Sequence, residues 1–506
     1  MLSKIKLQNI YRYTDLKINS IIIVTLLFFI VSLFGIINHE LWLDESHHFL
    51  LGRDSTSLFD LYKNSRYDGH PILWNYLIHL STRVTSNPLI MQVMHVNIST
   101  LVVFVFLKKA PFSLWFKIIF LLSYFMLYEY TIISRNYNLG LLFLFLSCSM
   151  YSRRNTNFKL LCFYLAMCCN THSIFIIISI ALLFILFLEQ LQTQKSKVLK
   201  TYWKGYLIFI IGFFIACIQI IPNSDSTFFS QIDYSNNYEV FKSGTSFFKA
   251  LFPIVDFTQK KYWNTFYFLE HFKTIGIGLS LLVWILPIIL FNKKRNTLIF
   301  VYLTFIGFIL FEIITRRYGV RYNGLLFLTL IVGLWISSMQ KELLLIKKDI
   351  SRYNHYIILI VMFCQCIGGT VAYALDLKKP FNYGKTVSEY IQDNDITTEI
   401  IITTCESASI NTYLGENLHH ICYGKRQGFY LWNKDCSEVY NLTDKEVITL
   451  VFLSKPNEKT LFLICAQPFK TKGLVIIEAN SYTVTSIKNF TNSVTQNYYI
   501  YSIEKK

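Results

Sequence analysis

The sequence predicts a polytopic α-helical membrane protein with a small α/β domain at its C-terminal end. Hydrophobic residues make up 53% of the 506-residue chain and charged residues only 16%, whereas soluble domains carry about 25% charged residues. Apolar runs close to the ~20 residues that span a bilayer recur between residues 20 and 375. Beyond about residue 379 the apolar runs shorten to strand length. The composition excludes a cytosolic enzyme, a secreted disulfide scaffold and a disordered chain.

Eleven apolar segments are predicted to cross the membrane. The first follows a short basic N-terminus, and no small-residue cleavage site comes after it. We therefore interpret it as a membrane anchor and not as a removed signal peptide. The predicted segments are 19–37, 88–107, 114–133, 137–150, 158–170, 172–188, 206–221, 275–291, 297–314, 322–338 and 356–373.

The charges of the connecting loops predict the orientation. Lysine and arginine gather in alternate loops, which the positive-inside rule assigns to the cytoplasm. These loops are at 108–109, 153–154, 195–204, 293–295 and 341–352. The other set, which includes the long loops 38–87 and 222–273 and the C-terminal domain, is expected to be extracytoplasmic. We therefore expect an integral protein of the plasma (inner) membrane with its N-terminus in the cytoplasm.

The net charge of +17 does not indicate a nucleic-acid partner. Residues 379–506 contain 13 basic and 13 acidic residues, so the whole excess lies in residues 1–378. In that part of the chain the excess positive charge lies in the predicted cytoplasmic loops, where basic residues set the orientation of membrane helices.

Residues 379–506 are predicted to form the extracytoplasmic α/β domain, outside the membrane core at 1–378. Short apolar runs separated by turn signals predict strands at 399–404, 447–453, 461–466, 474–478, 482–487 and 498–503, and helices at 385–393 and 408–414. Four cysteines in an oxidising compartment predict either one or two disulfides or a set of ordinary buried thiols. They are Cys405, Cys422, Cys436 and Cys465.

The first outer loop is long and polar. Two adjacent carboxylates, Asp44 and Glu45, follow the first span. Carboxylates at the boundary between water and lipid suit general-base or metal chemistry; the alternative is that they only cap a helix at the membrane surface. Pro71, followed by apolar and aromatic residues to Leu80, predicts an amphipathic helix that lies on the membrane.

The histidines of the outer loops raise the question of a metal. With the carboxylates, His47, His48, His70 and His172 include the ligand types of a zinc site. The sequence has neither a pair of histidines four residues apart nor a Cys-x-x-Cys motif beside them, so we expect no metal cofactor and keep a divalent cation as the alternative. It also lacks a Walker A loop and a dinucleotide fingerprint. Because nucleotide sugars and ATP are not supplied outside the cell, a group transferase there needs a donor carried on a lipid.

Three short outer turns carry polar groups that are costly at membrane depth. They hold Arg135 and Tyr137, then His172, then Arg316, Arg317 and Arg321. The positive-inside rule disfavours arginines in outer loops, so their presence there calls for another cause. They indicate an anionic ligand, because guanidinium binds phosphate bidentately and keeps its charge. The alternative is that they extend to lipid headgroups.

The order of these motifs resembles a known family. Trp42-Leu-Asp44-Glu45 follows the first span, and Gly69-His70-Pro71, Ser134-Arg135-Asn-Tyr137, Thr171-His172 and the late arginine turn come after it. This pattern is similar to the polyprenyl-phosphate-dependent glycosyltransferases of the C-type (GT-C) fold, the group that contains protein O-mannosyltransferases and lipid A aminoarabinose transferases. It covers most of residues 20–340. The chain departs from the pattern at Ile72, where many relatives have a second proline.

The resemblance implies transfer of a sugar from a polyprenyl-phosphate donor to a protein, lipid or polysaccharide acceptor at the outer face of the membrane. It implies Asp44 as the general base, with Glu45 positioning the base or the acceptor. Arg135, Arg316, Arg317 and Arg321 would bind the donor and its phosphate, and His70, Tyr137 and His172 would shape the cavity or hold the acceptor. Membrane lipids are the remaining partners expected.

Two other functions fit the same sequence. A flippase or transporter of lipid-linked sugars would also have many spans, but transporters place their binding groups near the middle of the membrane. Here the middles of the spans are nearly free of charge, and the polar residues gather at one interface, which favours an enzyme. The second alternative is a catalytically inactive relative that binds glycans or partners through its outer domain.

Overall fold

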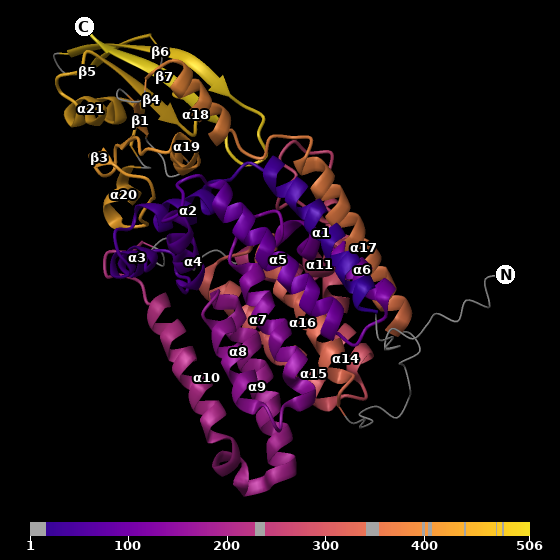
Figure 1. The fold of residues 1–506 in the computed structure, drawn as a ribbon. Helices are drawn as coiled ribbons and strands as arrows, with labels where there is room; N and C mark the ends of the chain where they lie inside the picture. The colour runs from indigo at the N-terminus through magenta and orange to yellow at the C-terminus, as the bar shows by residue number, and fades with distance from the viewer. Residues whose placement is uncertain are drawn as a thin grey trace.

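The computed structural model describes residues 17–227, 238–340, 354–396, 400–402, 407–439, 442–471, 473–477 and 480–506. These residues form a bundle of long helices with a mixed sheet at one end of it (Figure 1). Several features considered above lie wholly or partly outside the described residues: the N-terminus up to residue 16, residues 228–237 of the second long loop, the basic loop at 341–352, Cys405, and the ends of the strands predicted at 399–404 and 474–478.

The bundle contains helices with the length and composition needed to cross a membrane. Within the described residues, seven segments meet both criteria, and one of them, Ser173–Ile220, holds two helices joined by a short turn. The chain is therefore a polytopic membrane protein. The segments comprise α1 (Ile18–Asn38), α5 (Leu89–Lys109), α9 (Ser173–Gln194) with α10 (Val198–Ile220), α13 (Lys273–Val283) with α14 (Leu286–Phe291), α15 (Arg295–Thr315), α16 (Val320–Ser337) and α17 (Asn354–Asp376).

Shorter helices occupy the remaining predicted crossings. They are α6 (Leu114–Leu121), which the π-helix η2 (Tyr124–Glu129) follows, α7 (Tyr137–Met150) and α8 (Phe158–Cys169). Each predicted span therefore contains helix, although residues 122–123 and 130–133 of the span predicted at 114–133 are turns or bends. These stretches fall below the length of a full crossing, so the total of eleven crossings stays a prediction.

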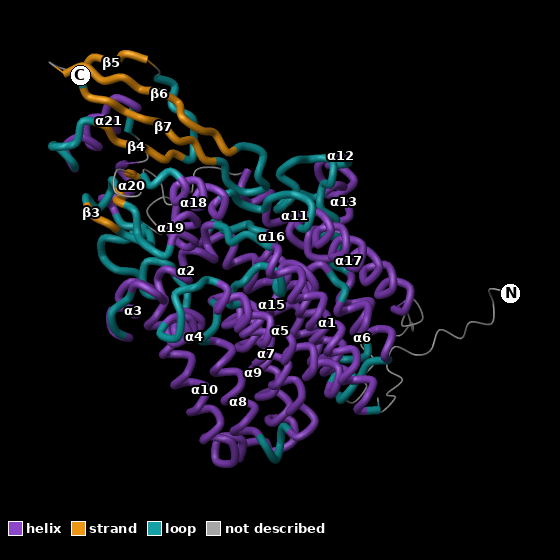
Figure 2. Tube along the Cα trace, turned by 45° about the horizontal axis from the view of Figure 1, so that its top comes forward, coloured by secondary structure: helices purple, strands orange, loops and turns teal. Residues whose placement is uncertain are grey.

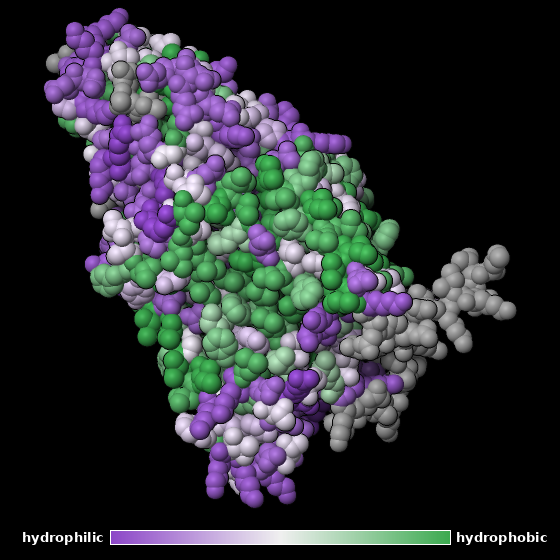
Figure 3. Space-filling view, in the orientation of Figure 1, coloured by the Kyte–Doolittle hydropathy of each residue, from purple (hydrophilic) through white to green (hydrophobic). Residues whose placement is uncertain are grey.

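Exposed apolar side chains surround the bundle as a belt. Leu27 of α1, Phe214 of α10 and Phe363 of α17 are exposed to 58%, 57% and 64%. Figure 3 shows the belt as a green band between the polar C-terminal region and a polar opposite end. Such a surface is suited to lipid tails. In contrast, every residue of α16 except Arg321 is buried, so α16 is a central helix.

The first predicted outer loop lies at the end of the bundle that carries the sheet. It folds into α2 (Leu43–Asp54), α3 (Leu58–Ser65) and α4 (Leu73–Thr82), and α4 corresponds to the helix expected near 71–80. In Figure 1 the turn between α9 and α10 lies at the opposite end. α2 and α4 pack closely, because a Cβ on Gly52 would lie 2.7 Å from Ile78. The second long outer loop contributes α11 (Tyr238–Leu251) and α12 (Tyr267–His271).

The C-terminal region is a seven-stranded mixed sheet with helices packed on it (Figure 2). The strand order is β3-β2-β1-β4-β7-β6-β5; β1 runs parallel to β2 and β4, and the other pairs are antiparallel. The strands are β1 (Ile400–Ile402), β2 (His419–His420), β3 (Lys425–Arg426), β4 (Thr460–Cys465), β5 (Gly473–Ile477), β6 (Asn480–Phe490) and β7 (Tyr498–Lys505). The helices are α18 (Gly384–Asp393), α19 (Ala408–Leu414), α20 (Lys434–Val439) and α21 (Asp444–Ser454).

The strand predicted at 447–453 is wrong, because these residues belong to α21. Thr443 and Glu446 form a capping box in front of the helix: the Glu446 carboxylate accepts a hydrogen bond from Thr443 N at 2.7 Å, and the Thr443 hydroxyl accepts one from Glu446 N at 3.4 Å. A short apolar run does not by itself distinguish a buried strand from a buried helix, whereas the cap selects the helix.

The cysteines of this region include both a disulfide and a free thiol. Cys422 and Cys436 form a disulfide with their Cα atoms 5.1 Å apart. Cys465 is a buried free thiol in β4. The disulfide closes the loop between β2 and α20, and this loop lies next to the cavity described below.

Candidate active site

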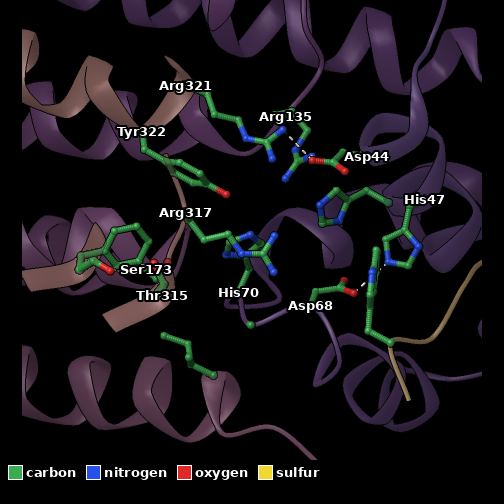
Figure 4. Close-up of a pocket in the computed structure, with 15 residues that line it drawn as sticks. Asp44, His47, Asp68, His70, Arg135, Ser173, Thr315, Arg317, Arg321 and Tyr322 are labelled. Carbon is green, nitrogen blue, oxygen red and sulfur yellow. Dashed lines mark hydrogen bonds and ion pairs between the residues drawn. The ribbon is translucent and has the colours of Figure 1, made fainter. Parts of the chain in front are cut away.

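The predicted outer residues surround a cavity of about 210 Å³ between the membrane bundle and the C-terminal region (Figure 4). α2 contributes Asp44, and the ends of the membrane helices contribute the groups that face it. The complete lining is Asp44, His47, His48, Asp68, Gly69, His70, Arg135, Ser173, Ile220, Phe311, Thr315, Arg317, Arg321, Tyr322 and Trp432. Ile220 and Phe311 lie on α10 and α15, whose exposed faces belong to the apolar belt. The cavity therefore joins a polar wall to an apolar one.

Asp44 lies between two arginines. One of its oxygens, Oδ2, forms ion pairs with Arg135 and with Arg321, whose Nη1 is 2.7 Å away. Figure 4 shows both guanidinium groups directed toward the Asp44 carboxylate. Arg321 also lies over the rings of Trp42 and Tyr322, at 5.2 Å from each centroid. This contact fixes the plane of its guanidinium group.

The two cations change the acidity of Asp44. Burial alone would raise the pKa of its carboxyl, but the positive charges of Arg321 and Arg135 outweigh burial and hold the pKa well below its usual range. Asp44 is therefore ionised at neutral pH. With both guanidiniums bound it is also a weak base, because its carboxylate is already strongly stabilised.

Glu45 points away from the cavity. Its side chain is fully buried, Oε1 accepts a hydrogen bond from Ser134 N at 2.5 Å, and Oε2 accepts one from Trp42 N at 3.3 Å. Glu45 therefore caps the first turn of α2 and holds the residue that precedes Arg135. From the sequence we expected the acidic pair either to take part in chemistry or to cap a helix. In the structure Asp44 faces the cavity, and Glu45 stabilises the helix start.

A buried ionic cluster lies behind Glu45. His39 Nε2 is 3.0 Å from Glu45 Oε2, and His39 Nδ1 is 2.9 Å from Asp376 Oδ2 at the end of α17. Burial alone would lower the pKa of His39, but Asp376 and Glu45 outweigh burial and raise the pKa to about 10. His39 is therefore a cation between two carboxylates. Phe381, which leads into the C-terminal region, packs on its ring at 4.5 Å.

His70, His172 and Tyr137 stack in a column beside the cavity. The ring centroids of His70 and His172 are 4.2 Å apart, and those of His172 and Tyr137 are 4.8 Å apart. His172 Nδ1 accepts a hydrogen bond from Ile174 N at 3.1 Å, so the neutral ring carries its proton on Nε2. Among the described residues, His172 Nε2, His70 Nδ1 and Tyr137 Oη are buried without a hydrogen-bond partner. Buried polar atoms usually have partners; of the three residues only His70 lines the cavity, so His70 is the candidate for a ligand contact and the other two support its ring.

His70 is electrically neutral at neutral pH. Burial lowers the pKa of its imidazole well below the usual value, and His172, Arg135 and Arg317 lower it further. Its ring can therefore donate or accept a single hydrogen bond without adding charge to the cavity.

The late arginines take different positions. Arg317 and Arg321 line the cavity, whereas Arg316 is not among the lining residues. Arg316 ends α15 in the left-handed region, with φ of 53°. The structure thus brings together Asp44, Arg135, Arg317, Arg321 and His70 at one cavity, and places Glu45, Tyr137, His172 and Arg316 behind or beside it.

The other loop histidines pair individually. His47 Nε2 is 2.9 Å from Asp68 Oδ1, and His48 Nδ1 is 2.6 Å from Asn75 Oδ1. Within the part of the chain that the structure describes, no group of three His, Cys, Asp or Glu side chains converges as metal ligands do.

His39, Asp376 and Trp432 are among the residues at or behind the site that were not identified from the sequence. His39 and Asp376 are polar groups at the ends of apolar spans, and this position is a signal that sequence analysis can use. For Trp432 the signal is weaker: it is an aromatic residue in a cysteine-flanked loop far from the motifs.

No family model matches the chain, and no curated protein matches it. Among solved structures, the cryo-EM structure of the arabinofuranosyltransferase AftD from mycobacteria is similar, with 11% sequence identity and a TM-score of 0.44. The similarity covers 97% of this chain and 40% of AftD. The chain thus spans less than half the length of the structure it matches.

Proposed function

We propose that this protein transfers a sugar from a polyprenyl-phosphate donor to an acceptor hydroxyl at the outer surface of the membrane. The observation that carries the proposal is the Asp44 carboxylate held by Arg135 and Arg321 in a cavity with one apolar wall. A lipid phosphate needs cations next to apolar surface, and a hydroxyl nucleophile needs a base within reach. The resemblance of the sequence motifs to C-type glycosyltransferases supports the same reaction.

In the proposed reaction the donor replaces the internal ion pair. Ile220 and Phe311 are placed to contact the first isoprene units, while the phosphate binds the guanidinium groups of Arg321, Arg317 and Arg135. Guanidinium binds phosphate at least as well as carboxylate. Loss of these cations raises the pKa of Asp44 toward that of an ordinary aspartate, so donor binding makes Asp44 a better base.

The chemical step then needs no further cofactor. Asp44 takes the proton of the acceptor hydroxyl as its oxygen forms a bond to the anomeric carbon. The bond from that carbon to the phosphate oxygen breaks, and the polyprenyl phosphate leaves with the electron pair. The arginines stabilise the charge on the departing phosphate. General-base catalysis of this kind typically contributes 10²–10⁴-fold.

The test uses the full chain in liposomes with radiolabelled polyprenyl-phosphate mannose or polyprenyl-phosphate arabinose. Methyl glycosides, a threonine peptide and phospholipids are offered as acceptors. We expect release of polyprenyl phosphate and transfer of label to one acceptor class, and release slowed about 10²–10⁴-fold in Asp44→Asn. If labelled donor crosses the bilayer with its sugar–phosphate bond intact, the protein is a transporter and the proposal is wrong.

A further inference from the structure

The C-terminal region reaches the cavity through the indole of Trp432. Among the described residues, it is the only lining residue that comes from beyond residue 378. Its ring lies edge-on to His47, with the centroids 4.7 Å apart, and contacts Tyr430 at 5.4 Å. The side chain is partly exposed. A part of this large aromatic surface is therefore available to a ligand in the cavity.

The loop that carries Trp432 is fixed at several points. The disulfide between Cys422 and Cys436 closes it. Thr227 N donates a hydrogen bond to Trp432 O at 2.8 Å, and Lys434 N donates one to Asp225 O at 3.1 Å. These bonds tie the loop to the segment that follows α10. The position of Trp432 is thus fixed both by its own region and by the segment that follows α10.

His47, which contacts Trp432, and its partner Asp68 each have one buried polar atom without a hydrogen-bond partner among the described residues. Asp68 Oδ1 and His47 Nε2 bond to each other at 2.9 Å. Asp68 Oδ2 and His47 Nδ1 are buried and have no hydrogen-bond partner among the described residues. The residues are only 7% and 2% exposed. Leaving such atoms unpaired is costly, and both residues line the cavity, so a ligand with hydroxyl groups would satisfy them.

This combination has the chemistry of a saccharide site. A sugar ring has a face of C–H groups, which packs on an indole, and hydroxyls at its rim, which bond to a carboxylate and an imidazole. His47 lies one turn after Asp44 on α2, and residues three apart lie on the same face of a helix. A sugar held here would have its hydroxyl groups next to the carboxylate assigned as the base.

We propose that Trp432, Asp68 and His47 form the acceptor subsite, and that the acceptor is a saccharide. The role as acceptor rests on the proposed function, whereas binding of a saccharide does not. The C-terminal region then determines specificity, because it supplies the surface on which the acceptor ring lies.

Binding is tested without turnover. Saturation-transfer NMR is recorded with methyl α-mannopyranoside and methyl α-arabinofuranoside on the full chain in nanodiscs. We expect Trp432→Ala to weaken binding of the preferred glycoside at least ~10-fold, by loss of an aromatic contact. Asp68→Asn is expected to weaken it as well, and Trp432→Phe by less than Trp432→Ala. The matched control is Trp203→Ala, because Trp203 is 51% exposed near the opposite end of α10.

The second test measures the kinetics of sugar transfer. With polyprenyl-phosphate donor, Trp432→Ala should raise the KM for the glycoside and leave binding of polyprenyl phosphate unchanged. The subsite is overturned if the wild-type chain binds neither glycoside, if Trp432→Ala binds as the wild type does, or if only the threonine peptide or phospholipid accepts the sugar. Glycoside binding that depends on Trp432, but without any sugar transfer, would contradict the proposed function and leave the saccharide site standing.

Discussion

Asp44 and Glu45 are neighbours in the chain, yet they lie in two chemically different regions. Asp44 faces a cavity, keeps 20% exposure of its side chain, and is bound by cations that an anionic ligand can also reach. Glu45 is fully buried and is bound by backbone amides and by His39. Successive residues of a helix point roughly 100° apart. One step along α2 therefore separates a carboxylate that faces the cavity from a carboxylate that is enclosed by the fold.

The two regions also differ in how their charge is balanced. Around Asp44, two arginines face one carboxylate, which leaves positive charge for a ligand. Around Glu45, one imidazolium lies between two carboxylates and connects the end of α1 to the end of α17. The arginines around Asp44 could therefore pair with a bound anion instead, whereas the ion pairs around His39 are enclosed by the fold. Each prediction below tests this difference.

The largest effect is expected for the proposed base. Asp44→Asn removes the base and keeps the size of the side chain, so we expect transfer to fall about 10²–10⁴-fold while the protein remains folded. The measurement is the rate of polyprenyl-phosphate release under single-turnover conditions. Glu45→Gln is the matched control, and we expect it to lower stability more than the rate per folded molecule. Equal loss of rate in both variants would contradict the division of roles.

Removal of the buried cation should lower stability strongly. His39→Gln leaves Glu45 and Asp376 as buried carboxylates without their counter-charge, which typically costs about 3–5 kcal/mol. We expect a lower melting temperature in detergent micelles and a smaller yield of folded protein. His419→Gln is the control, because His419 lies partly exposed in the C-terminal sheet. An unchanged melting temperature of His39→Gln would show that the cluster does not hold α1 and α17 together.

A milder change on the cavity side should affect donor binding instead. Arg321→Lys keeps the charge but loses the flat, forked geometry and the stacking on Trp42 and Tyr322. We expect binding of polyprenyl phosphate to weaken about 10-fold, as loss of one charge-assisted hydrogen bond predicts. Arg316→Lys is the comparison, because Arg316 does not line the cavity. If Arg316→Lys has the larger effect, the phosphate binds elsewhere in the arginine turn.

The last comparison is a pH dependence of stability, which tests the same buried cation without a mutation. The pKa of His39 is about 10 in the folded chain, against 6.5 for an ordinary histidine. Its raised pKa means that its stabilisation is complete below about pH 6.5 and is lost as the pH rises through 10. We expect the melting temperature of the wild type to fall between pH 7 and 10 by more than that of His39→Gln. Parallel curves for the two proteins would exclude His39 as the titrating group.

Much of the architecture could be predicted from the sequence, because hydropathy and loop charge are local properties. The positions of the apolar helices follow from run length, and Asp44, Arg135 and Arg321 stand out as charges at the ends of such runs. The direction of Glu45 could not be predicted, since it depends on the rotation of α2 against its neighbours. Nor could the place of Trp432, because hundreds of residues separate it from α2 and only tertiary structure brings them together.

The cavity draws on parts of the chain that the ribosome makes at very different times. Asp44 is translated before Arg321, and Trp432 follows both, on a loop that the disulfide between Cys422 and Cys436 closes. A chain made only as far as α15 would thus hold the carboxylate and Arg135, but neither Arg321 nor the indole. The complete lining of the cavity therefore forms only after the loop that carries Trp432 has been made and has folded against the helices.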